Sequence, residues 1–217
     1  MRKSNQVGAH FDKIANSYDL YKKNNQYYYD NLKILLASFI HSKSKVLEIG
    51  CGTGDLIASL KPEYGMGFDI SNKMIAIAKR KHRNIHFSTH WPKQKFDYIF
   101  MSDVVEHLEY PDETFRKISK LMNCKSIFIC TMANPKLEPI LMIAEKMKLK
   151  MPEGPHYRIK YKDLRSMIED SGMEIREHNF KLLIPIKIPL ITYFANKYLE
   201  RFFRKYAFIE YFTATKS

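Results

Sequence analysis

Compact apolar runs alternate with amphipathic segments along most of the chain. Short apolar runs bounded by turn residues are typical of strands that are buried on both faces of a sheet. Five such runs predict strands at Lys45–Ile49, Gly65–Ile70, Ile85–Ser88, Phe96–Met101 and Ser126–Met132. Because amphipathic segments separate these strands, the pattern favours an α/β fold around a parallel sheet.

Helix signals fill the intervals between the predicted strands. We expect helices that begin near Asp55 and Asp112, and helices over Asn72–Lys81, Val104–Leu108 and Lys162–Ser171. Asp112 follows Pro111 and is expected to cap its helix through the side chain, whereas Gly172 is expected to end the last helix.

Two further apolar runs, Met173–Phe180 and Phe208–Thr215, predict strands that we expect to pair antiparallel. Residues 136–156 and 181–207 exceed what a minimal α/β core needs. Long segments between core elements often carry binding residues, so specificity is expected to lie in these two inserts. Nothing in the pattern divides the chain, and residues 1–217 are expected to form one domain.

A glycine-rich turn follows the first predicted strand. Gly50, Gly52 and Gly54 allow a tight turn and a close approach of the main chain to a ligand. Dinucleotide enzymes use a related turn, but Asp55 stands where their pattern has its third glycine, which counts against NAD. Asp69 ends the second strand, where a carboxylate can accept hydrogen bonds from two ribose hydroxyls. The alternatives are a turn without a ligand and a helix cap at Asp69.

Four segments in this order resemble the class I S-adenosylmethionine (SAM)-dependent methyltransferases that act on small molecules: FDKIANSYD, VLEIGCGTGDL, GFDIS and FDYIFMSDVVEHL. By pattern the chain is most similar to the ubiquinone and menaquinone biosynthesis methyltransferases. The resemblance covers residues 11 to about 175. It implies a Rossmann-like, seven-stranded mixed sheet flanked by helices, with the last strand antiparallel. It further implies a helical lid at 1–40, a cofactor-binding half at 41–135 and a substrate-side half at 136–217.

The resemblance also implies which residues hold SAM. Glu48 and the turn residues Gly50, Cys51, Gly52 and Gly54 would bind the methionine moiety, Asp69 the ribose hydroxyls, and Ile70 would lie beside the adenine. By their position at the end of the fourth strand, Ser102 and Asp103 are expected near the methyl group or the methionine end. Tyr18 would close over the cofactor, with helical packing against Phe11 and Ile14 as the alternative.

The segment HFSTHWPKQKFD departs from the family pattern, because it lacks the acid that usually contacts the adenine. Trp91 is expected to stack on or cover the adenine there, with packing against the sheet edge as the alternative.

A general base is needed only if the acceptor carries a proton at neutral pH, as a phenol does, and histidine suits that role. His107 follows the fourth strand, and His156 lies in a segment similar to the substrate-covering loop of ubiquinone-type O-methyltransferases; His10 is a weaker candidate. We therefore expect methyl transfer to an oxygen of a small or lipid-like acceptor. A tRNA or rRNA methyltransferase and a catalytically silent cofactor-binding partner remain alternatives. No metal is expected, because no acidic or histidine cluster has ligand spacing.

The net charge of the chain indicates which kinds of partner it can bind. The 36 basic and 23 acidic side chains give a net charge of +13, which attracts nucleic acid, anionic membranes or acidic substrates. Residues 181–207 hold six basic side chains and one acidic, and from Ile191 they have the pattern of a basic amphipathic helix. Such a helix predicts peripheral membrane contact, core packing or a homodimer surface; nucleic acid is less favoured.

Composition and cysteine usage bound the class of protein. A hydrophobic content of 45% argues against general disorder. Cys51, Cys124 and Cys130 form no metal or redox motif and are expected to be reduced thiols in the cytoplasm. The first residues lack the apolar core of a signal peptide, and the apolar stretch 182–195 is too short and interrupted to cross a bilayer.

Overall fold

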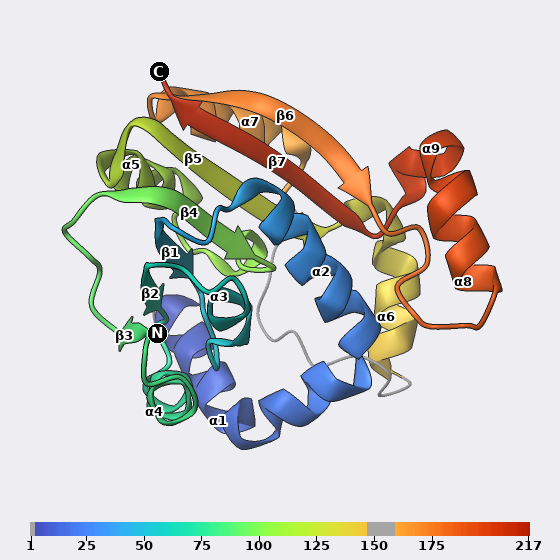
Figure 1. The fold of residues 1–217 in the computed structure, drawn as a ribbon, viewed down its shortest axis with the longest axis horizontal. Coiled ribbons are helices and arrows are strands. Elements are labelled where there is room, and N and C mark those ends of the chain that lie inside the picture. Colours follow the sequence, from blue (N-terminus) through green and yellow to red (C-terminus); the bar gives the residue numbers. More distant parts are fainter. Residues whose placement is uncertain (1–2, 147–158) are drawn as a thin grey trace.

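The computed structural model describes residues 3–146 and 159–217 and shows a single seven-stranded sheet in the order β3-β2-β1-β4-β5-β7-β6 (Figure 1). The strands are β1 (Lys45–Ile49), β2 (Tyr64–Phe68), β3 (His86–Ser88), β4 (Phe96–Ser102), β5 (Met122–Ala133), β6 (Met173–Lys181) and β7 (Ile209–Lys216). Only β7 runs antiparallel to its neighbours, β5 and β6. The expected seven-stranded mixed sheet is confirmed.

Helices cover both faces of this sheet. The α-helices are α1 (Lys3–Asn24), α2 (Gln26–Phe39), α3 (Asp55–Ser59), α4 (Asn72–Lys81), α5 (Pro111–Lys120), α6 (Glu138–Lys146), α7 (Tyr161–Asp170), α8 (Ile191–Phe194) and α9 (Glu200–Phe203). A π-helical turn, Ala195–Leu199, joins α8 to α9, and 3-10 turns lie at Val105–His107, Pro135–Leu137 and Arg204–Tyr206. None of the helices in the described residues is both long and apolar enough to span a bilayer.

Two helix predictions were wrong in detail. Pro111 is itself the first residue of α5, and Asp112 lies inside the first turn without capping the helix. The fixed φ of proline suits the first helical position, which moves the start of the helix ahead of Asp112. The helix expected at Val104–Leu108 is a 3-10 turn, Val105–His107. Gly172 ends α7 with a φ of 80°, as expected.

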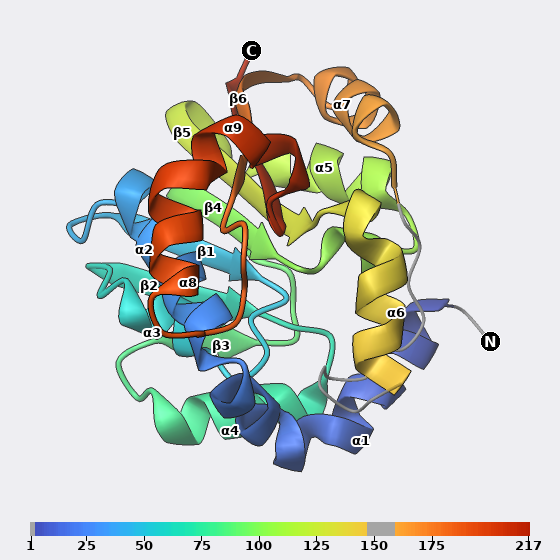
Figure 2. The same cartoon turned by 90° about the vertical axis from the view of Figure 1, so that its right-hand side faces the viewer.

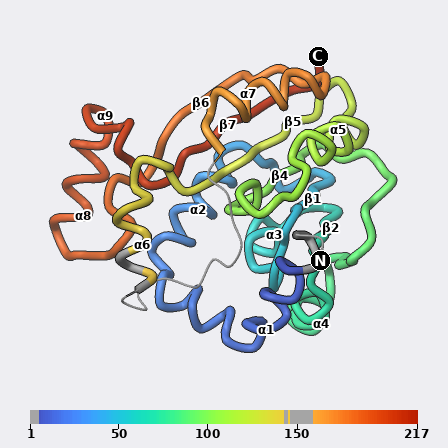
Figure 3. Tube along the Cα trace, turned by 180° about the vertical axis from the view of Figure 1, so that it is seen from behind, coloured from blue at the N-terminus to red at the C-terminus, as the bar shows by residue number. Residues whose placement is uncertain are grey.

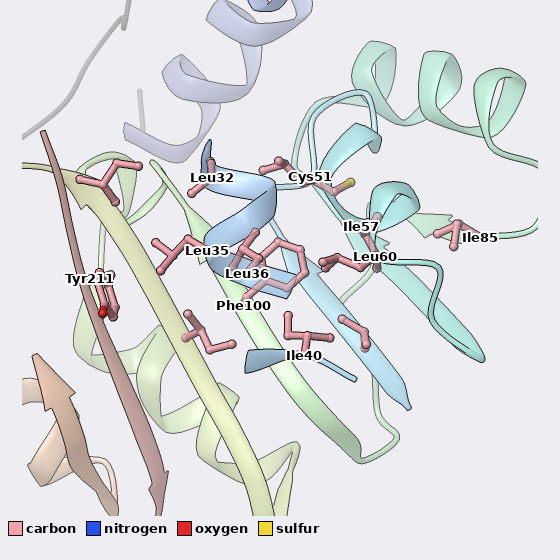
Figure 4. Close-up of a cluster of buried hydrophobic side chains, with 14 of the residues drawn as sticks. Leu32, Leu35, Leu36, Ile40, Cys51, Ile57, Leu60, Ile85, Phe100 and Tyr211 are labelled. Atoms are coloured by element: carbon pink, nitrogen blue, oxygen red, sulfur yellow. The ribbon is translucent and has the colours of Figure 1, made fainter. Parts of the chain in front are cut away.

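The core has two layers because side chains alternate across each strand. On one face α2, α3 and α4 pack against the sheet, and Leu32, Leu35 and Leu36 of α2 lie over Phe100 of β4 (Figure 4). On the other face α5 and α7 pack against the sheet (Figure 3), and the buried cluster there includes Ile99 of β4. Central strands buried on both faces explain the continuous apolar runs of the sequence.

The parallel strands all end at one edge of the sheet, where open α/β folds bind ligands. The glycine turn follows β1 at this edge, Asp69 follows β2 and Asp103 follows β4. In Figure 1, α6, α8 and α9 also stand beyond this edge. The residues predicted to bind the cofactor therefore share one side of the molecule.

Candidate active site

Three glycines shape the turn after β1. Gly50, Gly52 and Gly54 have φ values of 70°, 51° and 81°, in the left-handed region that disfavours residues with a Cβ. The surrounding space is also closed, because a Cβ on Gly50 would clash with Val104 and one on Gly52 would lie 3.1 Å from the ring of Tyr18. The side chains of Val104 and Tyr18 therefore lie against the main chain of this turn at distances that only glycine permits.

Asp69 joins the glycine turn to the end of β2. Its Oδ2 accepts a hydrogen bond from the N–H of Gly52 and its Oδ1 one from the N–H of Ser71, both at 2.8 Å. Burial raises the pKa of this carboxyl, and these N–H bonds oppose the rise. Ser71, whose side chain accepts from the N–H of Met74, is the residue that caps α4. A carboxylate offers about four acceptor sites, so Asp69 retains capacity for hydroxyl donors.

Helix α1 closes over the glycine turn. The ring of Tyr18 lies against Gly52, and burial is the main cause that raises the pKa of its phenol. The Lys22 ammonium is 5.3 Å from the centre of the Tyr18 ring. The edge-on contact of Tyr18 with Phe11 is the helical packing stated as the alternative, and closure of Tyr18 over a cofactor stays a prediction.

An ion cluster fastens α1 to the start of α3 and the end of α4. Asp55 accepts from Lys22 at 3.0 Å, from Lys81 at 2.7 Å and contacts the His82 ring at 2.9 Å. Lys81 also pairs with Asp19 of α1 at 2.7 Å. Although burial alone would raise the pKa of Asp55, these cations outweigh it and hold the pKa well below its ordinary value.

Glu48 is a buried carboxylic group beneath the turn. Its Oε2 accepts from the N–H of Ile57 in α3 at 3.1 Å. Burial raises the pKa of Glu48 from 4.5 to about 8, although Lys22 and the Ile57 N–H favour the ionised form. Glu48 thus accepts a hydrogen bond from the first turn of α3. With its pKa near 8, its carboxyl group is mostly protonated at physiological pH.

Two buried hydroxyls stand at the ends of β4 and β5. Ser102 and Thr131 lie opposite each other in the β4–β5 pair. Phe100 and Ile129, two positions earlier, belong to the core on the α2 face, so the two hydroxyl side chains lie on that face as well. The Oγ of Ser102 and the Oγ1 of Thr131 are buried, and neither has a hydrogen-bond partner in the described part of the chain. Such a group costs about 1–3 kcal/mol when it stays unsatisfied, so this site suits polar atoms of a ligand.

Asp103, the next residue after β4, has a φ of 55°. The hydroxyl of Tyr28 in α2 donates to its Oδ2 at 2.7 Å. A positive φ in a residue other than glycine is uncommon and often marks a functional position. The sequence placed Asp103 at this edge but did not reveal Tyr28, whose only signal is its place in the run of three tyrosines in the first turn of α2.

Two of the three candidate bases, His107 and His10, lie in the described residues. The His107 ring meets Phe11 of α1 edge-on, with 5.5 Å between ring centres, and His10 meets the same ring at 5.3 Å. His107 therefore lies at the junction of the lid and the edge of β4. His156 lies outside the described residues, so its role stays a prediction.

The two residues expected near the adenine differ in their surroundings. Ile70 is largely exposed just beyond β2, where α1 approaches it at Gly8. Trp91 is partly buried and packs edge-on against Phe68 of β2, with 4.9 Å between ring centres. This packing is the alternative stated for Trp91, and its contact with an adenine stays a prediction.

Comparisons with known proteins show the family of the chain. A methyltransferase-domain family model matches residues 21–178. The chain is 32% identical over 139 residues to an uncharacterised protein of Methanocaldococcus jannaschii, covering 59% of this chain and 52% of that one. It therefore spans about half the length of that relative.

A second relative is aligned more fully. The demethylmenaquinone methyltransferase of Staphylococcus saprophyticus is 23% identical over 190 residues, covering 78% of this chain and 81% of its own. Among solved structures, the magnesium protoporphyrin IX methyltransferase of Synechocystis PCC 6803 with bound SAH (S-adenosylhomocysteine) is 19% identical. It has a TM-score of 0.66 and covers 99% of this chain and 100% of its own, a likeness of fold. The family match over most of the chain confirms the resemblance: the chain belongs to the methyltransferase-domain family.

Proposed function

We propose that this protein transfers a methyl group from SAM to an oxygen of a small or lipid-like acceptor. The observation that carries the proposal is the hydrogen bond between Asp69 and Gly52, because it joins the carboxylate at the end of β2 to a turn whose glycines leave the main chain without side chains that would cover it. In this arrangement Asp69 would hold the ribose hydroxyls and Ile70 would lie beside the adenine. The turn residues 50–54 would hold the methionine moiety.

The polar residues near the turn suit the methionine end of SAM, which carries a carboxylate and an ammonium group. The unsatisfied hydroxyls of Ser102 and Thr131 can bond to polar atoms of the methionine end. Glu48 and Lys22 bring a carboxyl and an ammonium near the same turn. When bound, SAM supplies an activated methyl group on a sulfonium.

The chain itself has to position the acceptor and exclude water. Bringing reacting atoms into line at roughly 3–3.5 Å can supply much of the acceleration of such a displacement. The ion cluster at Asp55 holds α1 against the turn, and Tyr18 covers Gly52. For a hydroxyl acceptor, His107 or His156 would remove the proton.

Support for the acceptor class comes from the named relatives. One is named for demethylmenaquinone, and a neighbour in fold is named for magnesium protoporphyrin IX. Both are small molecules, which favours a small or lipid-like acceptor over RNA. We further propose that the protein meets such an acceptor at a membrane surface.

Calorimetry tests the cofactor first. We expect SAH to bind with micromolar affinity and NAD not to bind; NAD binding without SAH binding would refute the proposal. An acceptor screen with methyl-labelled SAM then follows, with quinol and phenol lipids in detergent and with total RNA as the contrasting arm. Label on an oxygen of a small acceptor is the expected product, and label on RNA alone would refute the acceptor class.

A further inference from the structure

The connection between β6 and β7 carries a surface unlike the rest of the molecule. Its helices α8 and α9 project from the body beyond the ends of the strands (Figure 1). Large apolar side chains on this connection face solvent: Leu190 is 82% exposed, Phe202 68% and Phe194 62%. Together with these, the exposed apolar side chains are Ile186, Ile188, Ile191, Tyr193, Tyr198, Leu199, Phe203 and Tyr206.

The side of this connection that faces the protein is small and polar. Thr192 and Ala195 are 2% and 5% exposed. The Thr192 hydroxyl donates to the carbonyl of Ile186 at 2.8 Å. Asn196 bonds to the main chain of Ile184, accepting from its N–H at 2.9 Å and donating to its carbonyl at 3.1 Å. These hydrogen bonds hold α8 and the π-helical turn to the preceding loop, and Asn196 also donates to the hydroxyl of Tyr27 in α2 at 3.2 Å.

This polarity is the reverse of that of an ordinary surface helix, which buries its apolar stripe. Core packing, one of the alternatives for residues 181–207, therefore does not account for the apolar side chains. Eleven large apolar side chains exposed on one connection are typical of a surface that meets another body. The helical segment is held in place by its polar side and presents its apolar side outward.

Cations surround the apolar side chains. Lys187, Lys197, Arg201, Arg204 and Lys205 are all exposed. The Arg201 guanidinium stacks 4.5 Å from the centre of the Phe202 ring, and the Lys197 ammonium lies 5.0 Å from that of Tyr193. Long basic side chains can keep their heads in water while their stems follow an apolar surface.

The one carboxylate in this segment has its partners at the end of β6 and just after it, and not among the five exposed cations. Glu200 accepts from the N–H of Leu182 at 2.7 Å and pairs with Lys181 at 3.4 Å. The outward surface is thus apolar at its centre and purely cationic among its charges. This combination complements an anionic lipid interface, which offers hydrocarbon and negative headgroups together.

The surface also lies at the edge of the sheet that holds the proposed cofactor site. Figure 2 faces the strand ends and shows α8 and α6 on either side of them. Ile140 and Met142 of α6 are exposed apolar side chains as well. A bilayer that contacts the α8–α9 connection would therefore lie on the side from which an acceptor reaches the strand ends.

We infer that the exposed side chains of residues 186–206, here called the α8–α9 face, dock into the interface of an anionic lipid bilayer. Docking in this orientation lets a lipid-like acceptor pass from the bilayer to the strand ends; this delivery rests on the proposed function, and the docking does not. A second copy of the chain is a poorer occupant, because a two-fold contact would bring the same cations of both copies together. Phosphates of RNA offer no partner for the isoleucine and leucine side chains.

Co-sedimentation with vesicles tests the docking. The unmodified protein should bind vesicles of phosphatidylcholine mixed with phosphatidylglycerol, and bind phosphatidylcholine alone weakly. The triple variant Leu190→Ser/Phe194→Ser/Phe202→Ser should bind the mixed vesicles at least about tenfold more weakly, because the inserted apolar area is lost. The variant Lys197→Gln/Arg201→Gln/Lys205→Gln should lose on the order of a hundredfold, since each nearby cation contributes roughly fivefold.

Matched controls remove exposed side chains of the same kinds from other surfaces. Ile34→Ser/Tyr110→Ser and Lys93→Gln/Lys120→Gln should bind vesicles like the unmodified protein. Equal binding by the serine triple variant would overturn the docking, as would a solution dimer that this variant dissociates. SAH calorimetry on the same proteins separates the two proposals: vesicle binding without SAH binding keeps the docking and refutes the proposed function.

Discussion

The main-chain N–H of Gly52 donates to the carboxylate of Asp69 across 2.8 Å, so the turn after β1 and the end of β2 are one unit. The other carboxylate oxygen accepts from Ser71 at the start of α4. A change at either residue therefore affects both the shape of the turn and the carboxylate that we assign to the ribose.

Asp69→Asn should weaken SAH binding at least about tenfold, or roughly 1.4 kcal/mol. The amide keeps one acceptor and turns a donor toward a main-chain N–H, so a bond in the site is lost. Calorimetry measures the affinity, and urea unfolding should show a loss of about 1–3 kcal/mol.

Asp97→Asn is the matched control for this prediction. Asp97 likewise accepts from a main-chain N–H, that of Lys45 at 2.8 Å, but near the amino ends of the strands. The control should lose stability and keep its SAH affinity. Unchanged SAH affinity in Asp69→Asn would remove this residue from the site.

Gly52→Ala should lower both stability and SAH affinity. A side chain at a φ of 51° costs about 1–2 kcal/mol, and its Cβ would press on the Tyr18 ring. Gly172→Ala has a comparable backbone strain at a φ of 80°, but its Cβ would meet only open space and Ser119. If both variants lose stability and both keep full SAH affinity, the turn does not hold the cofactor.

The sequence predicted those parts of the structure that depend on local pattern. Apolar runs located the strands, and the spacing of Gly52 and Asp69 from their strands placed these two residues together, since parallel strands end at one edge. Tyr28 was missed because its bond to Asp103 joins residues 75 positions apart, and no local pattern encodes that approach. Pro111 displaced the expected start of α5 because proline favours the first helical position.

The α8–α9 face shows a different limit of sequence reasoning. The amphipathic pattern after Ile191 revealed a polar side and an apolar side but not which of them faces the protein. Hydrogen bonds from Thr192 and Asn196 to the preceding loop decide that orientation. They depend on the path of the chain between β6 and α8, which the sequence pattern did not reveal.

Glu48→Gln should flatten the pH dependence of stability between about pH 4.5 and pH 8, the ordinary and folded pKa values of this group. Because the folded protein holds the proton more tightly, the unfolded chain releases it first as the pH rises. The stability associated with the protonated carboxyl is therefore lost progressively toward pH 8. At about 1.4 kcal/mol per pKa unit, we expect the variant to gain roughly 3 kcal/mol at pH 8 relative to pH 5, compared with the unmodified protein.

Urea unfolding at the two pH values measures this difference. Glu63→Gln, which changes an exposed carboxylate, should leave the pH dependence unaltered. An identical slope in Glu48→Gln and the unmodified protein would show that Glu48 is ionised in the folded state throughout this range.

His107→Ala and His156→Ala test the general base. If one of these histidines is the base, its replacement by alanine should lower kcat with a hydroxyl acceptor by a factor of roughly 100 or more and leave the SAH affinity unchanged. Histidine loss should matter less as the pH rises, because hydroxide and ionised acceptor replace the base. His86→Ala, at an exposed position in β3, is the control. Full turnover in both variants would mean that no histidine base is used at these positions.

Ser102→Ala and Thr131→Val should change stability and binding in opposite directions. Each removes a buried hydroxyl that has no partner in the described chain, so the ligand-free protein should gain about 1 kcal/mol. SAH binding should weaken, because the same hydroxyls are assigned to its methionine end. Ser126→Ala is the contrasting control: its buried hydroxyl donates to the Phe96 carbonyl at 2.6 Å, so its removal should cost stability and leave SAH affinity intact. If Ser102→Ala and Thr131→Val lose stability without affecting SAH binding, these hydroxyls serve the fold and the methionine end lies elsewhere.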